Sequence, residues 1–104
     1  MAIITIRIPP PGTRLRFDSS KDPSDVFDYA MDFKQLLQSD TINTATVTAT
    51  EVTIDSSSVS GNVVTFFVSG GTNGNSGVIT VKIVTSNATP RIFERSFKIK
   101  VEDK

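Results

Sequence analysis

Apolar and polar residues alternate along most of the chain, which is the pattern of β-strands with one buried face. The clearest case lies within residues 26–33, where large apolar side chains occupy every second position: Phe27, Tyr29, Met31 and Phe33. A period of two collects these side chains on one face of a strand, whereas a helix would spread them around its surface. We therefore predict a central strand here, with its aromatic face in the core.

Two further alternating stretches flank a glycine-rich segment within Val63–Val84. Large apolar residues again occupy alternate positions: Val64, Phe66, Val68, Ile79, Val81 and Ile83. The intervening glycines permit turn conformations that other residues avoid. Because the connection is too long for a two-residue hairpin, we predict a strand, a turn and a second strand, with a connection long enough to cross between sheets.

The remaining pattern predicts more strands separated by turns. Strands are expected over 2–8, 13–18 and 91–101, with one long or two short strands in 41–54. The last strand should direct Phe97, Ile99 and Val101 inward and Lys98 and Lys100 outward. We expect turns or loops over 19–25, 55–62 and 86–90, a single helical turn or a short bridge in 34–40, and a frayed end over 102–104.

This spacing of short strands and turns predicts an all-β fold, an immunoglobulin-like antiparallel β-sandwich of about seven strands. A chain of 104 residues has room for one domain with one core. It contains no cysteine and no tryptophan, so it lacks the disulfide and buried indole of antibody domains.

The N-terminal segment has two interpretations. Three prolines at 9–11 form a stiff spacer after the predicted strand. The strand is either the first strand of its own sandwich or an arm that adds to the sheet edge of a neighbouring subunit. In the second case, residues 1–12 are an arm and 13–104 are the sandwich. The candidate partner-binding residues are then Ile3, Ile4, Ile6, Arg7 and Ile8.

Charge and hydropathy point to partners that are proteins. The chain has 11 Lys and Arg and 11 Asp and Glu residues, so its net charge gives no attraction to nucleic acid or anionic lipid. A net charge of zero also gives little protection from self-association. No apolar run is long enough to span a membrane, and the start lacks the features of a secretory signal, so we expect synthesis in the cytoplasm.

Few residues offer catalytic chemistry. Without histidine or cysteine, the common triads and thiolate metal sites are excluded. Asp28 and Asp32 would lie about 13 Å apart on a strand, beyond the roughly 5 to 9.5 Å of glycosidase carboxylates. Asp18, Asp22 and Asp25 lack the spacing of a calcium loop and indicate an aspartate-rich turn.

The glycine-rich segment differs from a phosphate-binding loop because it leads into a strand and contains no lysine. We therefore expect a protein that is not an enzyme and that uses no metal, cofactor or small-molecule substrate.

Two sets of motifs resemble the fiber-tail adaptor proteins of tailed bacteriophages, also described as immunoglobulin-like virion proteins. The first set lies in Lys21–Ile42, at Lys21, Asp22, Pro23, Val26, Asp28, Tyr29, Asp32, Phe33, Leu36, Asp40, Thr41 and Ile42. The second set comprises Ser69–Thr72 and then Arg91, Glu94, Arg95, Ser96 and Phe97. The chain departs from the family at Phe33, where tryptophan is usual, and at Val78, where tyrosine is usual.

The resemblance implies a non-catalytic virion protein, made in the host cytoplasm, that joins tail or fiber components through its arm and sheet edges. It also implies other virion proteins as partners and assembly in several symmetric copies, without nucleic acid or membrane. Two alternatives remain open. One is a capsid decoration protein that staples neighbouring coat subunits. The other is a carbohydrate-binding module for host attachment, which would need exposed aromatic side chains.

Overall fold

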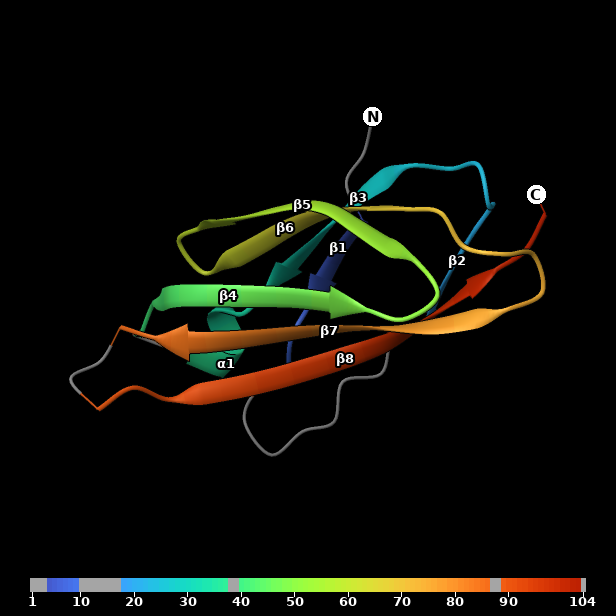
Figure 1. Cartoon of the computed structure of the whole chain (residues 1–104). Coiled ribbons are helices and arrows are strands. Elements are labelled where there is room, and N and C mark those ends of the chain that lie inside the picture. The colour runs from blue at the N-terminus through green and yellow to red at the C-terminus, as the bar shows by residue number, and fades with distance from the viewer. Residues whose placement is uncertain (1–3, 10–17, 38–39, 87–88, 104) are drawn as a thin grey trace.

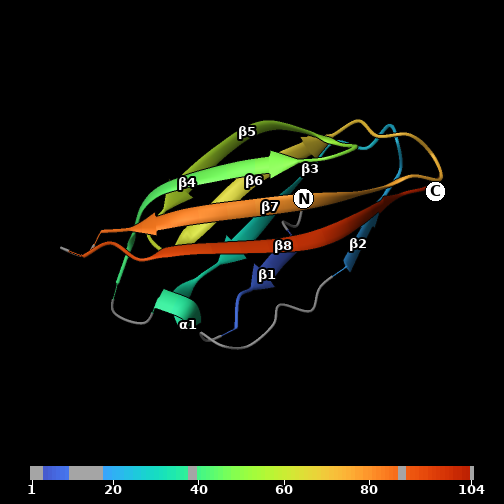
Figure 2. The same cartoon turned by 60° about the horizontal axis from the view of Figure 1, so that its bottom comes forward.

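Two four-stranded sheets pack face to face in the computed structural model, which describes residues 4–9, 18–37, 40–86 and 89–103 (Figures 1 and 2). The first sheet has the order β1-β3-β6-β5 and the second has the order β2-β8-β7-β4. The described elements are β1 (Ile4–Arg7), β2 (Asp18–Lys21), β3 (Phe27–Asp32), α1 (Lys34–Leu37), β4 (Ile42–Ala49), β5 (Thr53–Ser60), β6 (Val63–Ser69), β7 (Ser76–Thr85) and β8 (Ile92–Val101).

The predicted all-β sandwich is confirmed. The order of the first sheet is that of the A-B-E-D sheet of immunoglobulin domains, and β4, β7 and β8 follow the order C-F-G. Most neighbouring strands are antiparallel, but β1 pairs with β3 in parallel and β2 pairs with β8 in parallel. The sandwich is therefore rich in antiparallel pairs without being purely antiparallel.

The core lies between the sheets and is filled by the predicted alternate residues. The strand prediction for 26–33 is confirmed, because β3 lies between β1 and β6 and buries Tyr29 and Met31. The Tyr29 ring connects the two layers, with its centroid 5.7 Å from that of Phe66 in the first sheet and 5.4 Å from that of Phe97 in the second. Ring pairs at such distances add attraction to the apolar burial that holds the sheets together.

The unit predicted for Val63–Val84 is confirmed, including its change of sheet. β6 belongs to the first sheet and β7 to the second, and the glycine-rich loop connects them (Figure 1). The final strand also follows its prediction, since Phe97, Ile99 and Val101 are buried while Lys98 and Lys100 are exposed.

Some predicted boundaries were wrong. The loop expected over 55–62 is largely strand, because β5 continues to Ser60 and pairs with β6. The turn expected over 19–25 begins only at Asp22, where the Asp25 amide donates to the Asp22 carbonyl. The stretch 41–54 contains β4 and the start of β5, separated at Glu51, whose φ of 70° ends the first strand. The strand expected over 13–18 falls mostly outside the described residues.

Candidate docking surfaces

The N-terminal strand is part of the chain's own sandwich. β1 pairs with β3 in register from Ile4 opposite Tyr29 to Arg7 opposite Asp32, and the side chains of Ile6 and Ile8 are buried in the core. Burying two isoleucines contributes roughly 3 to 6 kcal/mol, which favours this position over a detached arm. The first interpretation of the segment therefore describes the folded chain, and the boundary at residue 12 does not separate β1 from the sandwich.

The five candidate residues of the N-terminal segment divide by exposure. Ile6 and Ile8 contact the core, so a partner cannot reach their side chains while β1 stays in place. Ile4 is 37% exposed and Arg7 is exposed, and both remain accessible. Ile3 lies outside the described residues. What β1 offers a partner is thus its outer backbone edge, Ile4 and Arg7.

A pocket of about 270 Å³ opens where β1 ends beside α1, and its walls are Arg7, Ile8, Asp32, Lys34 and Gln35. One carboxylate oxygen of Asp32 accepts a hydrogen bond of 2.9 Å from the Lys34 amide, at the start of the helical turn. In the part of the chain that the structure describes, neither Arg7 nor Lys34 forms an ion pair within 4 Å. The pocket therefore presents two cationic side chains to solvent beside one carboxylate.

The opposite side of the first sheet ends in β5, an eight-residue strand that pairs with β6 alone among the described strands. Every residue of β5 is exposed except the half-buried Ile54. Val59 lies opposite the core residue Val64 and shares its face, yet Val59 is 40% exposed. On the outer face, the neighbouring Phe67 of β6 is 42% exposed.

Natural proteins usually protect such edges with lysine, proline or a very short strand. Residues 56–60 of β5 are Ser-Ser-Ser-Val-Ser and contain none of these devices. A register shift between Ile54 and Ser56 is the one irregularity of this strand's pairing with β6, and Asp55 at that point accepts a hydrogen bond from Ser69. The remainder of the edge is an uncharged row of backbone donors and acceptors.

The glycine-rich loop at the end of the sandwich is tied to its neighbours by hydrogen bonds. Lys21 is 1% exposed, and its Nζ donates to the carbonyls of Asp22 at 2.7 Å and Gly70 at 2.6 Å. The Glu51 carboxylate accepts from the Thr72 amide and from the Asn75 side chain, each at 3.0 Å. These contacts fix the loop against β2 and against the β4–β5 turn.

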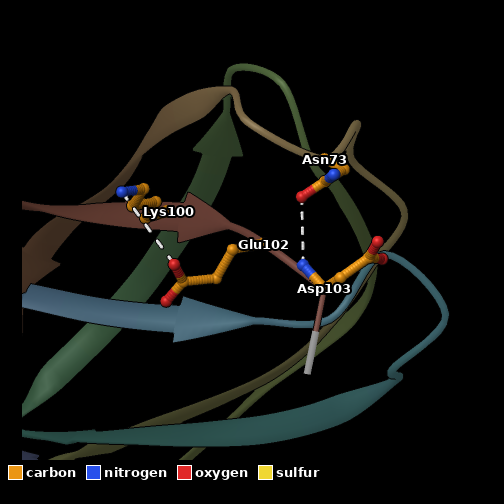
Figure 3. Close-up of polar contacts among 4 residues, drawn as sticks. All are labelled: Asn73, Lys100, Glu102 and Asp103. Atoms are coloured by element: carbon orange, nitrogen blue, oxygen red, sulfur yellow. Dashed lines mark hydrogen bonds and ion pairs between the residues drawn. The ribbon is translucent and has the colours of Figure 1, made fainter.

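The final residues complete this end of the molecule. The Asp103 amide donates to the Asn73 side chain at 3.0 Å (Figure 3). The Glu102 amide donates to the Lys21 carbonyl at 2.9 Å. Lys100 lies 3.9 Å from Glu102. The frayed end expected over 102–104 is therefore wrong for Glu102 and Asp103, because both backbone amides are hydrogen-bonded.

Two of the sequence motifs meet in this arrangement. Lys21 opens the first motif and Gly70 belongs to the Ser69–Thr72 motif, and the lysine ammonium binds the glycine carbonyl directly. Tyr29, also in the first motif, shares a hydrogen bond with the Ser19 hydroxyl of β2 in the other sheet. Both contacts join the first sheet, or the loop that leaves it, to β2. These residues of the two motifs thus form contacts that stabilise the fold.

The carboxylates considered for metal binding do not form a site. Among the described residues, no group of three or more Asp, Glu, His or Cys side chains is placed to hold a metal ion. Asp22 instead shapes its own turn by accepting from the Ser24 amide. Asp28 and Asp32 both lie on the outer face of β3. No helix in the described ranges has the length and hydropathy to cross a membrane.

The sequence did not predict strand β5, because a run of serines resembles a loop. It also did not predict the pocket, because the residues that line it come from β1, β3 and α1.

Whole-chain comparison with known proteins gives a distant structural similarity. No curated protein matches the sequence. The solution structure of Amebosin is similar with a TM-score of 0.42 and 14% identity, over 98% of this chain and 100% of that chain.

A family model gives a clear result. The motifs that resemble phage fiber-tail adaptors lie between Lys21 and Phe97. The model described as podophage GP4 fiber-tail adaptor protein gp77 matches residues 21–100, about three quarters of the chain. The match contains every residue quoted for the resemblance, which is thereby confirmed. The chain therefore belongs to the family of podophage fiber-tail adaptor proteins.

Proposed function

We propose that this structural adaptor joins its neighbours in the virion by strand addition, with β5 as the principal docking edge. The main supporting observation is the exposed border that the eight-residue β5 gives the first sheet, which carries no charge from Ser56 to Ser60. An extended segment of a tail or fiber protein would continue the sheet through main-chain hydrogen bonds. No cofactor or substrate takes part in such a contact.

The surroundings of β5 select the kind of segment that fits. The edge between Ser56 and Ser60 carries no charge, so an uncharged strand meets no repulsion there. Val59 is exposed on the inner side of the sheet and Phe67 on the outer side. A partner strand with apolar residues at successive positions would cover both sides, since side chains alternate between faces.

β1 supplies a second edge on the far side of the same sheet, where no described strand pairs with its outer border. An adaptor holds at least two neighbours, and opposite edges of one sheet can hold two without overlap. Ile4 and Arg7 are the side chains of this edge that a second partner would contact.

The test blocks the β5 edge without disturbing the fold. Val59→Lys places a charge on the inner side of the edge, which disfavours strand addition. Ser96→Lys is the control, because it adds the same charge at an exposed strand position of the other sheet, away from β5. Circular dichroism and thermal unfolding verify that both variants fold.

Particles assembled with each tagged variant are separated into tails and heads, and the chain is detected by immunoblot. We expect wild type and Ser96→Lys in the tail fraction and Val59→Lys absent from it. Equal incorporation of Val59→Lys would refute docking at β5. Recovery of the wild-type chain in empty heads would instead favour the capsid decoration protein.

A further inference from the structure

Two regions of the molecule carry opposite charge. The molecule measures 45 × 25 × 23 Å, and β4, β7 and β8 run along its long direction (Figure 1). One end, the acidic pole, contains the glycine-rich loop, the β4–β5 turn and the last described residues. A second region, the basic pole, contains α1, the end of β1 and the β7–β8 turn; the end of β1 lies near the middle of the long direction, whereas β7 ends near the side opposite the acidic pole (Figure 1).

Among the described residues, the acidic pole has five carboxylates and two lysines: Asp22, Asp25, Glu51, Glu102 and Asp103, with Lys21 and Lys100. Lys21 is buried and bound to two carbonyl groups, so it contributes little positive charge at the surface. Asp25, Glu51 and Asp103 are exposed. This end therefore presents carboxylates to whatever approaches it.

The basic pole contains Arg7, Lys34 and Arg91, all exposed, with Asp32 and Asp40. Asp40 is buried and accepts a hydrogen bond from the Thr41 amide, so its carboxylate contributes little negative charge at the surface. Arg7 and Lys34 line the pocket described above. Its volume of about 270 Å³ is below the roughly 300 to 1,000 Å³ of small-molecule sites and suits an acidic side chain or a short acidic loop.

We propose that the pocket at the basic pole of one copy receives the acidic pole of a second copy, so that the chains associate head to tail. The charges complement each other, and a net charge of zero leaves no overall repulsion between copies. Because the two surfaces differ, the contact is heterologous and can repeat from copy to copy. It uses no residue of β5 and leaves the β5 edge accessible to other virion proteins.

The test is a charge exchange followed by sedimentation velocity. Arg7→Glu with Lys34→Glu reverses the basic pole, and Asp25→Lys with Asp103→Lys reverses the acidic pole. At about 0.01 M salt the screening length is roughly 30 Å, and at 1 M it is about 3 Å. We expect the wild-type chain to form faster-sedimenting species at low salt and to sediment as a monomer at high salt.

Each reversed variant alone should remain monomeric at low salt. An equimolar mixture of the two variants should associate again, because the intact acidic pole of Arg7→Glu/Lys34→Glu still fits the intact basic pole of Asp25→Lys/Asp103→Lys. Lys82→Glu, an exposed change in the middle of β7, is the control and should associate like wild type. Circular dichroism checks that each variant folds.

Two results would overturn the proposal: a wild-type chain that stays monomeric at low salt, or association that survives both reversals. Val59→Lys should leave head-to-tail association unchanged. Failure of this contact and failure of docking at β5 can therefore be distinguished.

Discussion

Two buried polar side chains, Tyr29 and Lys21, connect parts of the molecule that apolar packing alone would leave less well fixed. Tyr29 fills the core with its ring and reaches Ser19 in the other sheet with its hydroxyl. Lys21 extends along the end of the core and satisfies its ammonium group with the carbonyls of Asp22 and Gly70. Each fixes the position of β2, a strand of only four residues.

Tyr29→Phe tests the first contact. The substitution keeps the ring and removes the hydrogen bond to Ser19, so we expect a loss of about 0.5 to 1.5 kcal/mol of unfolding free energy. Urea unfolding at neutral pH measures it. A double-mutant cycle with Ser19→Ala checks the pairing, because the two losses should not add if they remove one shared contact.

Tyr29 also predicts a pH dependence. Burial raises its pKa above the ordinary value of 10.0, and the hydrogen bond shared with Ser19 opposes this only partly. Above about pH 10 the unfolded chain therefore releases the phenol proton more readily than the folded chain, and stability falls as the pH rises. Tyr29 is the single tyrosine of the chain, so phenolate absorbance follows it directly. Tyr29→Phe should show a smaller alkaline loss, and an equal loss would contradict the assignment.

The aromatic cluster predicts a large effect at Phe66, which is fully buried and lies 6.4 Å from Phe97 between ring centroids. Phe66→Ala should cost roughly 3 to 5 kcal/mol. The exposed Phe67 on the same strand is the control, since Phe67→Ala should change stability far less. Thermal or urea unfolding of the two variants tests which face of β6 is inward.

At the scale of elements, close approach of two strands requires glycine at one position. A Cβ at Gly77 of β7 would lie 2.1 Å from the carbonyl oxygen of Thr50 after β4, and backbone cannot move aside as a flexible side chain can. The other end of the same connection is held by Lys21 and Glu51. Strand β7 can therefore pair with β4 along its length only with glycine at 77.

Gly77→Ala is expected to destabilise the fold by about 1 to 3 kcal/mol or more, because the extra methyl group forces β4 and β7 apart. Ser76→Ala is the neighbouring control and should stay within about 0.5 kcal/mol of wild type, since Ser76 is exposed. Equal stability of both variants would show that the β4–β7 contact is looser than described.

β1 gives a second prediction at this scale. Removing residues 1–9 deletes a strand of the first sheet together with Ile6 and Ile8, so the truncated chain should lose several kcal/mol of stability and expose apolar core. A shift of the urea midpoint to much lower concentration is expected. If the truncated chain were as stable as the full chain, the result would support the interpretation of β1 as a detachable arm.

At the scale of the whole molecule, the sandwich offers two kinds of contact. Its lateral borders, β5 and β1, provide backbone for strand addition, and its two poles carry complementary charge. The β5 edge shares no residue with the poles, whereas Arg7 belongs both to the β1 edge and to the basic pole. One copy can therefore bind further copies at its poles and another virion protein at β5. Membership of a fiber-tail adaptor family is consistent with such a division.

The sequence by itself determined the β-class, the inward residues of β3, β6, β7 and β8, and the family. It could do so because apolar and polar residues that alternate with a period of two indicate which side chains of a strand become buried. It could not place Ser56–Ser60, whose weak strand preference was overridden by pairing with β6.

Only the tertiary structure decided that β1 belongs to the sandwich, that Lys21 holds Gly70, and that Arg7 and Lys34 share a pocket. Each of these facts joins residues distant in sequence or on different elements. Such contacts depend on which strands become neighbours in the sheets, and the local pattern of apolar and polar residues does not indicate this.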